Sequence, residues 1–286
     1  MGGGSYSSTD RAVRAKYAGY YTDSREEIFK ERSINNAMSP YGVKVRESRD
    51  SEEHPNSLGI IIGLDVTGSM GSVPHHLVQD GFPDIMDLII KRGIADPQVL
   101  FLGIGDHECD DAPLQVGQFE SSDKLLDKWL TTVWLEGGGG GNAGESYLLA
   151  WYFAAFHTSM DCFEKRGEKG FLFTIGDEPV LKQVPSKFLK MLMGDGQYED
   201  YSAQALYDKA REKFNVHHID IKETYSGSRQ KVIDGWRQLL VDNLHVAKRH
   251  EDVSGIIAGI ISGGDGVSQE APAKEEAEMK EEEMML

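Results

Sequence analysis

Three short, uninterrupted apolar segments are the feature that most restricts how this chain can fold. They occupy 58–65 (LGIIIGLD), 98–104 (QVLFLGI) and 170–176 (GFLFTIG). Segments of this length, rich in β-branched or aromatic residues, are typical of strands that a parallel sheet buries on both faces. A further strand is predicted at 215–221, and the short segment 114–119 is predicted to pair antiparallel with the strand at 98–104.

Helical segments separate the predicted strands. We expect helices at 74–92, 122–136, 145–157, 203–214 and 229–243. Strands that alternate with helices indicate an α/β fold with a doubly wound, mostly parallel sheet flanked by helices. Ligands of such sheets bind at the carboxyl ends of the strands. Asp65, Asp106 and Asp177 are therefore candidate site residues, because each lies at the exit of a predicted strand.

Composition divides the chain into four parts: an N-terminal arm over 1–57, an α/β domain over 58–245, a helical segment over 246–269 and an acidic tail over 270–286. The arm begins with Gly/Ser-rich residues 1–9, which are expected to be flexible. It also contains a capping-box pattern from Ser24 to Glu27, which predicts a short helix. The tail is rich in Glu and is expected to be disordered or a solvated helix.

The balance of charge excludes several classes of function. The chain has 30 Lys and Arg against 47 Asp and Glu, a formal charge of -17, and no basic cluster of the kind that binds nucleic acid. Its longest apolar runs are too short to cross a membrane, and it begins without a secretory signal. Cys109 and Cys162 lack CxxC spacing, so neither a disulfide framework nor a structural zinc site is expected. These observations favour a cytoplasmic protein.

A cluster of oxygen-bearing side chains follows the first predicted strand. Asp65, Thr67 and Ser69 stand at alternate positions of the loop DVTGSM. Alternate residues of an extended turn can point the same way. Carboxylate and hydroxyl oxygens suit hard cations such as Mg2+, which keep near-octahedral geometry and some of their waters. The spacing therefore predicts a metal site at this loop.

The same loop resembles the first loop of the metal-ion-dependent adhesion site (MIDAS) of von Willebrand factor A (vWA) domains, whose pattern is Asp-x-Ser/Thr-x-Ser. FTIGDEP resembles the third loop of that site, and its acidic residue is Asp177. The resemblance covers roughly 58–245 and fits the intracellular prokaryotic and phage type. It implies that Asp65, Thr67, Ser69 and Asp177 bind Mg2+, with Mn2+ or Ca2+ as alternatives, and that Asp65 binds directly or through water.

The middle loop departs from the usual vWA pattern, which has Thr in a GGTxT setting. Here five glycines precede Asn142, and Glu145 follows three residues later. The arrangement is closer to the intracellular variant GGGDxPE, with Asn142 at its Asp and Glu145 at its Glu. A coordinating Glu145 would add a third negative charge beside the ion, so we favour Asn142 as the ligand and expect Glu145 to cap or orient the next helix. Glu145 or a water as the ligand remains an alternative.

The resemblance implies metal-dependent protein binding and no enzymatic activity. An acidic residue of a partner would complete the shell of the ion, and relatives of this type often work beside AAA+ ATPases of the MoxR type. One alternative is a metal-dependent hydrolase with Asp106 or Glu145 as the base. Another is a structural or assembly protein with a vestigial metal site. Two other hypotheses are weaker, because Glu145 stands where a P-loop needs Lys and because Ser69 lacks the first Gly of a GxSxG motif.

Overall fold

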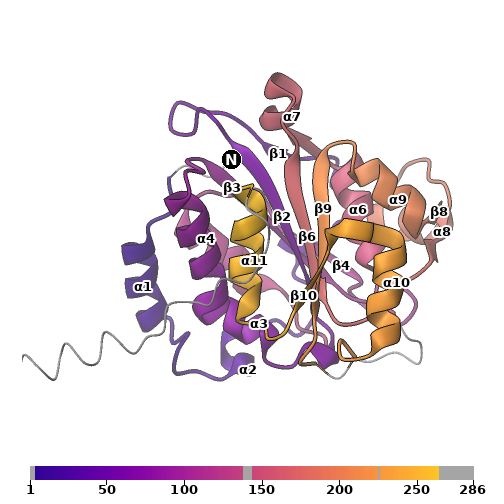
Figure 1. Cartoon of the computed structure of the whole chain (residues 1–286), viewed down its shortest axis with the longest axis horizontal. Helices are drawn as coiled ribbons and strands as arrows, with labels where there is room; N and C mark the ends of the chain where they lie inside the picture. The colour runs from indigo at the N-terminus through magenta and orange to yellow at the C-terminus, as the bar shows by residue number, and fades with distance from the viewer. Residues whose placement is uncertain (1–3, 138–143, 225, 264–286) are drawn as a thin grey trace, which may run out of the picture.

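The computed structural model describes residues 4–137, 144–224 and 226–263, and its centre is a six-stranded sheet in the order β10-β9-β6-β2-β3-β4 (Figure 1). The doubly wound, mostly parallel α/β fold that the sequence predicts is confirmed. The strands of this sheet are β2 (Leu58–Asp65), β3 (Pro97–Ile104), β4 (Leu114–Val116), β6 (Gly170–Gly176), β9 (Phe214–Ile221) and β10 (Leu244–Ala247). Neighbouring strands are parallel except for β4, which pairs antiparallel with β3 as predicted.

The order in which strands are added to the sheet reverses between β2 and β6. From β2 the chain moves to β3 and β4 on one side, and it then returns to lay β6, β9 and β10 on the other. Doubly wound sheets open a crevice at such a point, outside the carboxyl ends of the two strands that flank it. All eight residues of β2 and all eight of β3 are buried, so the ends of these strands are held by a close-packed core.

Three helices cover one face of the sheet: α6 (Tyr147–Phe156), α9 (Ala203–Ala210) and α10 (Gln230–Leu240). In Figure 1 they lie together to the right of the strands. Their aromatic residues interlock, since the Trp151 ring contacts both Tyr207 at 5.6 Å and Trp236 at 6.1 Å between centroids. Nine of the ten residues of α6 are buried, which explains why its sequence is apolar on all sides.

The opposite face is covered by the helices α3 (Val73–His76), α4 (Phe82–Lys91), α5 (Asp123–Thr132) and α11 (Asp252–Ile261). Phe82 packs edge-on against Phe101 of β3 at 4.8 Å, and the Ser254 hydroxyl of α11 donates to the Gly81 carbonyl at 2.9 Å. The single helix predicted over 74–92 is divided here. A π-helical turn over Leu77–Gly81 separates α3 from α4, and Pro at position 83 lies just after it.

The N-terminal arm is docked on this second face by a buried ion pair. The helix α1 (Ser8–Tyr17) lies beside α5, and Arg11, 2% exposed, bonds Asp127 at 3.2 Å. The flexible stretch expected over 1–9 therefore overlaps a helix, because the Ser7 side chain caps it by accepting from the Asp10 amide. The capping box predicted from Ser24 to Glu27 is present and opens α2 (Arg25–Ile28).

Smaller elements that the sequence did not indicate complete the fold. The strand pairs are β1 (Arg46–Ser48) with β5 (Thr158–Met160), and β7 (Gln183–Val184) with β8 (Tyr201–Ser202), and the further helices are α7 (Asp161–Arg166) and α8 (Ser186–Met193). The predicted domain boundary at 245 falls within β10, whose pairing with β9 continues to Ala247. Over the ranges that the structure describes, no helix has both the length and the apolar character needed to cross a membrane. The acidic tail at 270–286 lies outside the described residues.

Candidate metal site at the carboxyl edge of the sheet

Three buried aspartates meet at the ends of three neighbouring strands. Asp65 is the last residue of β2, Asp177 directly follows β6, and Asp106 lies two residues beyond β3. Asp65 and Asp177 are fully buried, and Asp106 is 2% exposed. Asp65 and Asp177 lie at the carboxyl ends of the neighbouring strands β2 and β6, the position at which a doubly wound sheet binds its ligands. The fold thus brings together residues that are far apart in the sequence.

A row of side-chain oxygen atoms in close contact runs from Asp65 to Asp177. The Thr67 hydroxyl donates to Asp65 Oδ1 at 2.6 Å and lies 3.2 Å from the Ser69 hydroxyl. The Ser69 hydroxyl donates to Asp177 Oδ1 at 2.7 Å, across 108 residues of sequence. A short 3-10 turn over Gly68–Met70 holds the loop in this position. The structure therefore places Asp65, Thr67, Ser69 and Asp177 in one cluster, as the sequence predicted.

The cluster has a buried side and an open side. Asp65 and Asp177 lie below the surface, whereas Ser69 is exposed to solvent together with its neighbours Gly68 and Gly71. A ligand that reached the hydroxyls would approach from the side of Ser69. This arrangement resembles a surface-exposed binding position more than an enclosed substrate chamber.

Tyr147 contacts Asp65 and so belongs to the site, although no sequence motif points to it. Its hydroxyl donates to Asp65 Oδ2 at 2.7 Å, while Asp65 Oδ1 accepts from both the amide and the hydroxyl of Thr67. Both oxygens of Asp65 are therefore already bonded. Gly176 makes room for the tyrosine, because a Cβ atom there would lie 1.9 Å from the Tyr147 hydroxyl oxygen. The only hint in the sequence is a tyrosine at the start of an otherwise apolar helix.

Several buried carboxylate oxygens near the cluster have no hydrogen-bond partner. They are Asp177 Oδ2, Asp106 Oδ2, Glu145 Oε2 and both side-chain oxygens of Asp220. Asp220 lies on β9 directly beside Gly176 of β6 and is fully buried. Within the described ranges, no ion pair with Lys, Arg or His involves these carboxylates or Asp65. Buried carboxylates without a counter-charge are costly, so this edge of the sheet is suited to a cation.

Burial and mutual repulsion perturb the pKa values of these acids. Burial, with a smaller contribution from Asp177, raises the pKa of Asp65 to about 7. Burial and the charge of Asp177 likewise raise the pKa of Asp220 to about 7. Burial, followed by the charges of Asp65 and other nearby acids, raises the pKa of Glu145 to about 10. In each case burial is the largest cause, and the charge of a neighbouring acid adds to it.

The middle loop is described only in part. Asn142, the predicted ligand, and the glycines at 138–141 lie outside the described residues. Glu145 is described, and its backbone bridges Val180 in the loop that follows Asp177. Glu145 does not cap the following helix, because α6 begins at Tyr147 and its N-cap residue is Ser146. That Glu145 orients this helix stays a prediction.

The hydrogen bonds of Ser69 and His107 do not form a nucleophile–base pair. The Ser69 hydroxyl donates to Asp177 and lies 3.2 Å from the Thr67 hydroxyl, whereas the His107 ring lies 2.7 Å from the Ser146 hydroxyl. A cavity of about 350 Å³ lies nearby between β4 and α8, with Pro40, Asp111, Leu114 and Phe188 among its lining residues. Asp65, Thr67, Ser69 and Asp177 do not line it.

No protein-family model matches the chain, and no curated protein sequence matches it. Among solved structures, the pilus adhesin SpaC from Lactobacillus rhamnosus GG is similar, with 12% identity and a TM-score of 0.48 over 76% of this chain and 31% of that chain. Proximal thread matrix protein 1 from the mussel byssus is similar with 11% identity and a TM-score of 0.46, over 76% of this chain and 49% of that one. This chain thus spans less than half the length of either protein.

Proposed function

We propose that this chain is a metal-dependent protein-binding module of the vWA type. In this proposal Asp65, Thr67, Ser69 and Asp177 hold a divalent cation, Mg2+ in the first instance, at the carboxyl edge of the sheet. Asn142 is proposed as the ligand from the middle loop. The proposal rests on one observation: a row of carboxylate and hydroxyl oxygens runs from Asp65 through Thr67 and Ser69 to Asp177.

The spacing of these oxygens fits a small octahedral ion. Ligands at adjacent corners of an octahedron with bonds of about 2.0–2.1 Å lie roughly 2.9 Å apart. The Thr67 and Ser69 hydroxyl oxygens are separated by 3.2 Å. Both hydroxyls donate their hydrogen to a carboxylate, so their lone pairs remain free to face a cation.

The four side chains have different roles in this proposal. Asp65 already accepts three hydrogen bonds, from Thr67 and Tyr147, and it therefore suits contact through water and orientation of the loop. Asp177 keeps one oxygen without a partner, which suits direct contact with the ion. Two ionised aspartates beside a divalent ion would leave the centre close to neutral, which tolerates an incoming carboxylate.

The partner would supply that carboxylate. Because Ser69 is exposed, an Asp or Glu on a protein surface can reach the open side of the cluster. The vWA resemblance suggests an AAA+ ATPase of the MoxR type as the partner and a cytoplasmic setting. No reaction is required of the chain in this role, and we propose that it is not an enzyme.

Capture with controlled metal tests the proposal. The purified chain, immobilised in millimolar Mg2+, is expected to retain a partner from the lysate of its own cells and to release it in EDTA. Ser69→Ala is the informative variant, because it removes one hydroxyl from an exposed position without burying any new group. Equal capture by Ser69→Ala and wild type, or capture that persists in EDTA, would contradict metal-dependent binding.

The middle loop needs its own test, because its proposed ligand lies outside the described residues. Calorimetric Mg2+ titration of Asn142→Ala is expected to show weaker binding than wild type. Glu145→Gln is expected to keep its affinity, since burial and neighbouring acids raise the pKa of Glu145 to about 10 and leave it protonated near neutral pH. Loss of Mg2+ in the Gln variant, with normal binding by the Ala variant, would exchange the two roles.

A further inference from the structure

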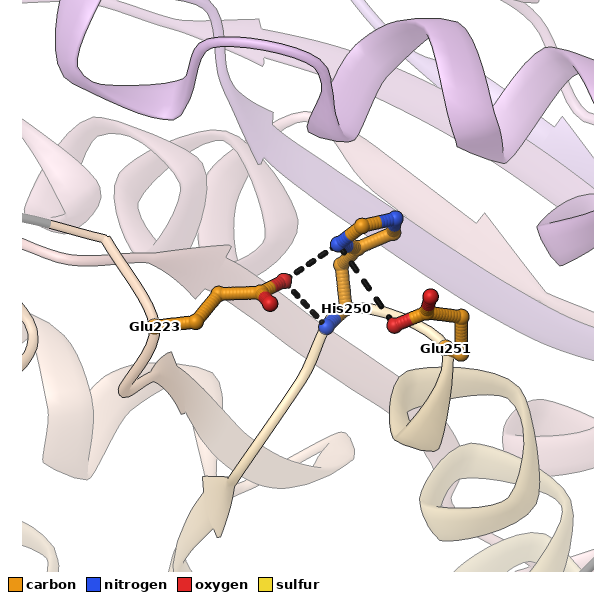
Figure 2. Close-up of side chains that lie close together, drawn as sticks. All are labelled: Glu223, His250 and Glu251. Atoms are coloured by element: carbon orange, nitrogen blue, oxygen red, sulfur yellow. Dashed lines mark hydrogen bonds and ion pairs between the residues drawn. The ribbon is translucent and has the colours of Figure 1, made fainter.

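A second group of side chains that could hold a metal ion lies beyond the ends of β9 and β10. Within the described ranges, Glu223, His250 and Glu251 each offer one ligand atom, and these atoms all lie within 4.8 Å of one another. Glu223 follows β9, while His250 and Glu251 lie in the turn between β10 and α11. Figure 2 shows the two carboxylates on either side of the His250 ring nitrogen that they share. The fold thus joins residues that are separated by 27 positions in sequence.

The backbone holds this arrangement in place. Glu223 Oε1 accepts from the His250 amide at 2.7 Å and also bonds His250 Nδ1. Glu251 Oε2 lies 3.7 Å from the same nitrogen. Ligands of a tetrahedral ion with bonds of about 2.0–2.2 Å lie roughly 3.3–3.6 Å apart. Small rotations of the side chains would therefore place all three atoms around one ion.

A second imidazole stands beside the group. The ring of His76, from α3, lies 4.5 Å from the ring of His250 between centroids. Burial, and then the charge of His250, lower the pKa of His76, although Asp80, Glu251 and Glu223 act in the opposite direction. The side chain of His250 is 19% exposed, so an ion can reach the group from solvent.

We propose that Glu223, His250 and Glu251 bind a borderline divalent transition metal of the Zn2+ type, with water at the fourth position. Imidazole and carboxylate together suit Zn2+ at four-coordinate sites, whereas Mg2+ prefers oxygen ligands alone. This site goes beyond the proposed protein-binding function and does not depend on it. Binding would tie the end of β9 to the turn that starts α11, and so would stabilise the docking of that helix against α4.

An ion pair competes with the metal for one ligand. Arg249 Nε donates to Glu251 Oε2 at 3.1 Å, so the guanidinium and the ion would share this carboxylate. A purely electrostatic cluster, in which protonated His250 pairs with the two glutamates, is the alternative outcome. Removal of Arg249 separates the two cases, because it frees Glu251 for a metal but removes one partner from an ion-pair network.

Calorimetric titration of the full chain with Zn2+ tests the assignment. Millimolar Mg2+ is kept in the buffer so that Zn2+ does not report on the Asp65–Asp177 cluster. Wild type is expected to bind one equivalent of Zn2+, and His250→Ala and Glu223→Gln are expected to weaken this binding at least about tenfold. Lys248→Ala, an exposed neighbour, is the matched control, and Asp177→Ala should also keep the zinc equivalent.

Two further observations complete the test. Circular dichroism shows whether each variant keeps its fold, and Arg249→Ala is expected to bind Zn2+ more tightly than wild type. The proposal is overturned if wild type binds no Zn2+, if His250→Ala and Glu223→Gln bind it normally, or if Arg249→Ala loses it. Loss of the zinc equivalent in Asp177→Ala alone would place the zinc at the Asp65–Asp177 cluster, and would also count against the assignment.

Discussion

Neutralising Asp177 should leave the metal-free protein about as stable as wild type and remove most of the stabilisation that Mg2+ provides. In the metal-free protein Asp177 is fully buried, accepts one hydrogen bond from Ser69 and has one oxygen without a partner. Asp177→Asn keeps an acceptor for Ser69, and the weaker hydrogen bond costs roughly 1 kcal/mol. It also removes a buried negative charge that has no positive partner, which offsets this cost.

The size of that compensation follows from the neighbouring acids. The pKa values of Asp65 and Asp220 are each raised from 3.8 to about 7. Because one pKa unit corresponds to about 1.4 kcal/mol, each shift is on the order of 4 kcal/mol. Burial is the larger cause for both residues, so repulsion by Asp177 accounts for the smaller part. We therefore expect this partial relief to offset the weaker hydrogen bond, which leaves the metal-free variant about as stable as wild type.

Mg2+ should then stabilise wild type more than Asp177→Asn. An ion at 100 times its dissociation constant stabilises the native state by about 2.7 kcal/mol, provided that it binds only that state. For a chain of this size the gain corresponds to a rise in Tm of about 5–10 °C. Asp177→Asn should show little of this rise. Differential scanning fluorimetry of both proteins, in EDTA and in a series of Mg2+ concentrations, measures the difference directly.

Two results would refute this reasoning. If Asp177→Asn is unfolded or strongly destabilised in EDTA, the residue supports the fold and its assignment as a ligand is wrong. If both proteins gain the same Tm from Mg2+, the ion binds elsewhere. Ser69→Ala serves as a second variant, because it removes a hydroxyl ligand from the exposed side of the same loop and leaves the buried charges unchanged.

Three further changes test other parts of the structure. Tyr147→Phe removes the donor to Asp65 Oδ2 and should weaken Mg2+ binding roughly 10- to 100-fold in calorimetry, with the fold retained in circular dichroism. In EDTA, ionisation of Asp220 should lower the free energy of unfolding as pH rises from about 4 to 7, because its native pKa is raised to about 7. Urea unfolding at pH 5 and 7.5 should therefore show a smaller loss of stability at the higher pH for Asp220→Asn than for wild type. Arg11→Ala should cost roughly 3 kcal/mol in urea unfolding, because it removes a buried partner of Asp127; a cost below about 1 kcal/mol would show that the arm does not depend on this pair.

The periodicity of the sequence was sufficient to predict five of the six strands of the central sheet, and β10 was not predicted. Strands buried on both faces are continuous apolar runs, and this local signal does not depend on the rest of the fold. The segments at 58–65 and 170–176 match β2 and β6 at both ends, and the antiparallel pairing of β4 was also predicted. The loop from Asp65 to Ser69 could be selected as a candidate site because its three oxygen-bearing side chains lie within five consecutive residues.

Other features depended on contacts between distant segments, for which the sequence has no local signal. Tyr147 reaches Asp65 only because Gly176 leaves space for its ring, and Asp220 joins the acidic edge only because β9 pairs with β6. The helix at Ser8–Tyr17 was missed because its stability comes from Arg11, which is buried against Asp127 at a separation of 116 residues. Short helices of this kind form through tertiary packing, since local propensity alone does not offset the entropy of ordering the chain. The sequence by itself therefore determined which chemical groups stand at the strand ends, and the tertiary structure decided which of them meet.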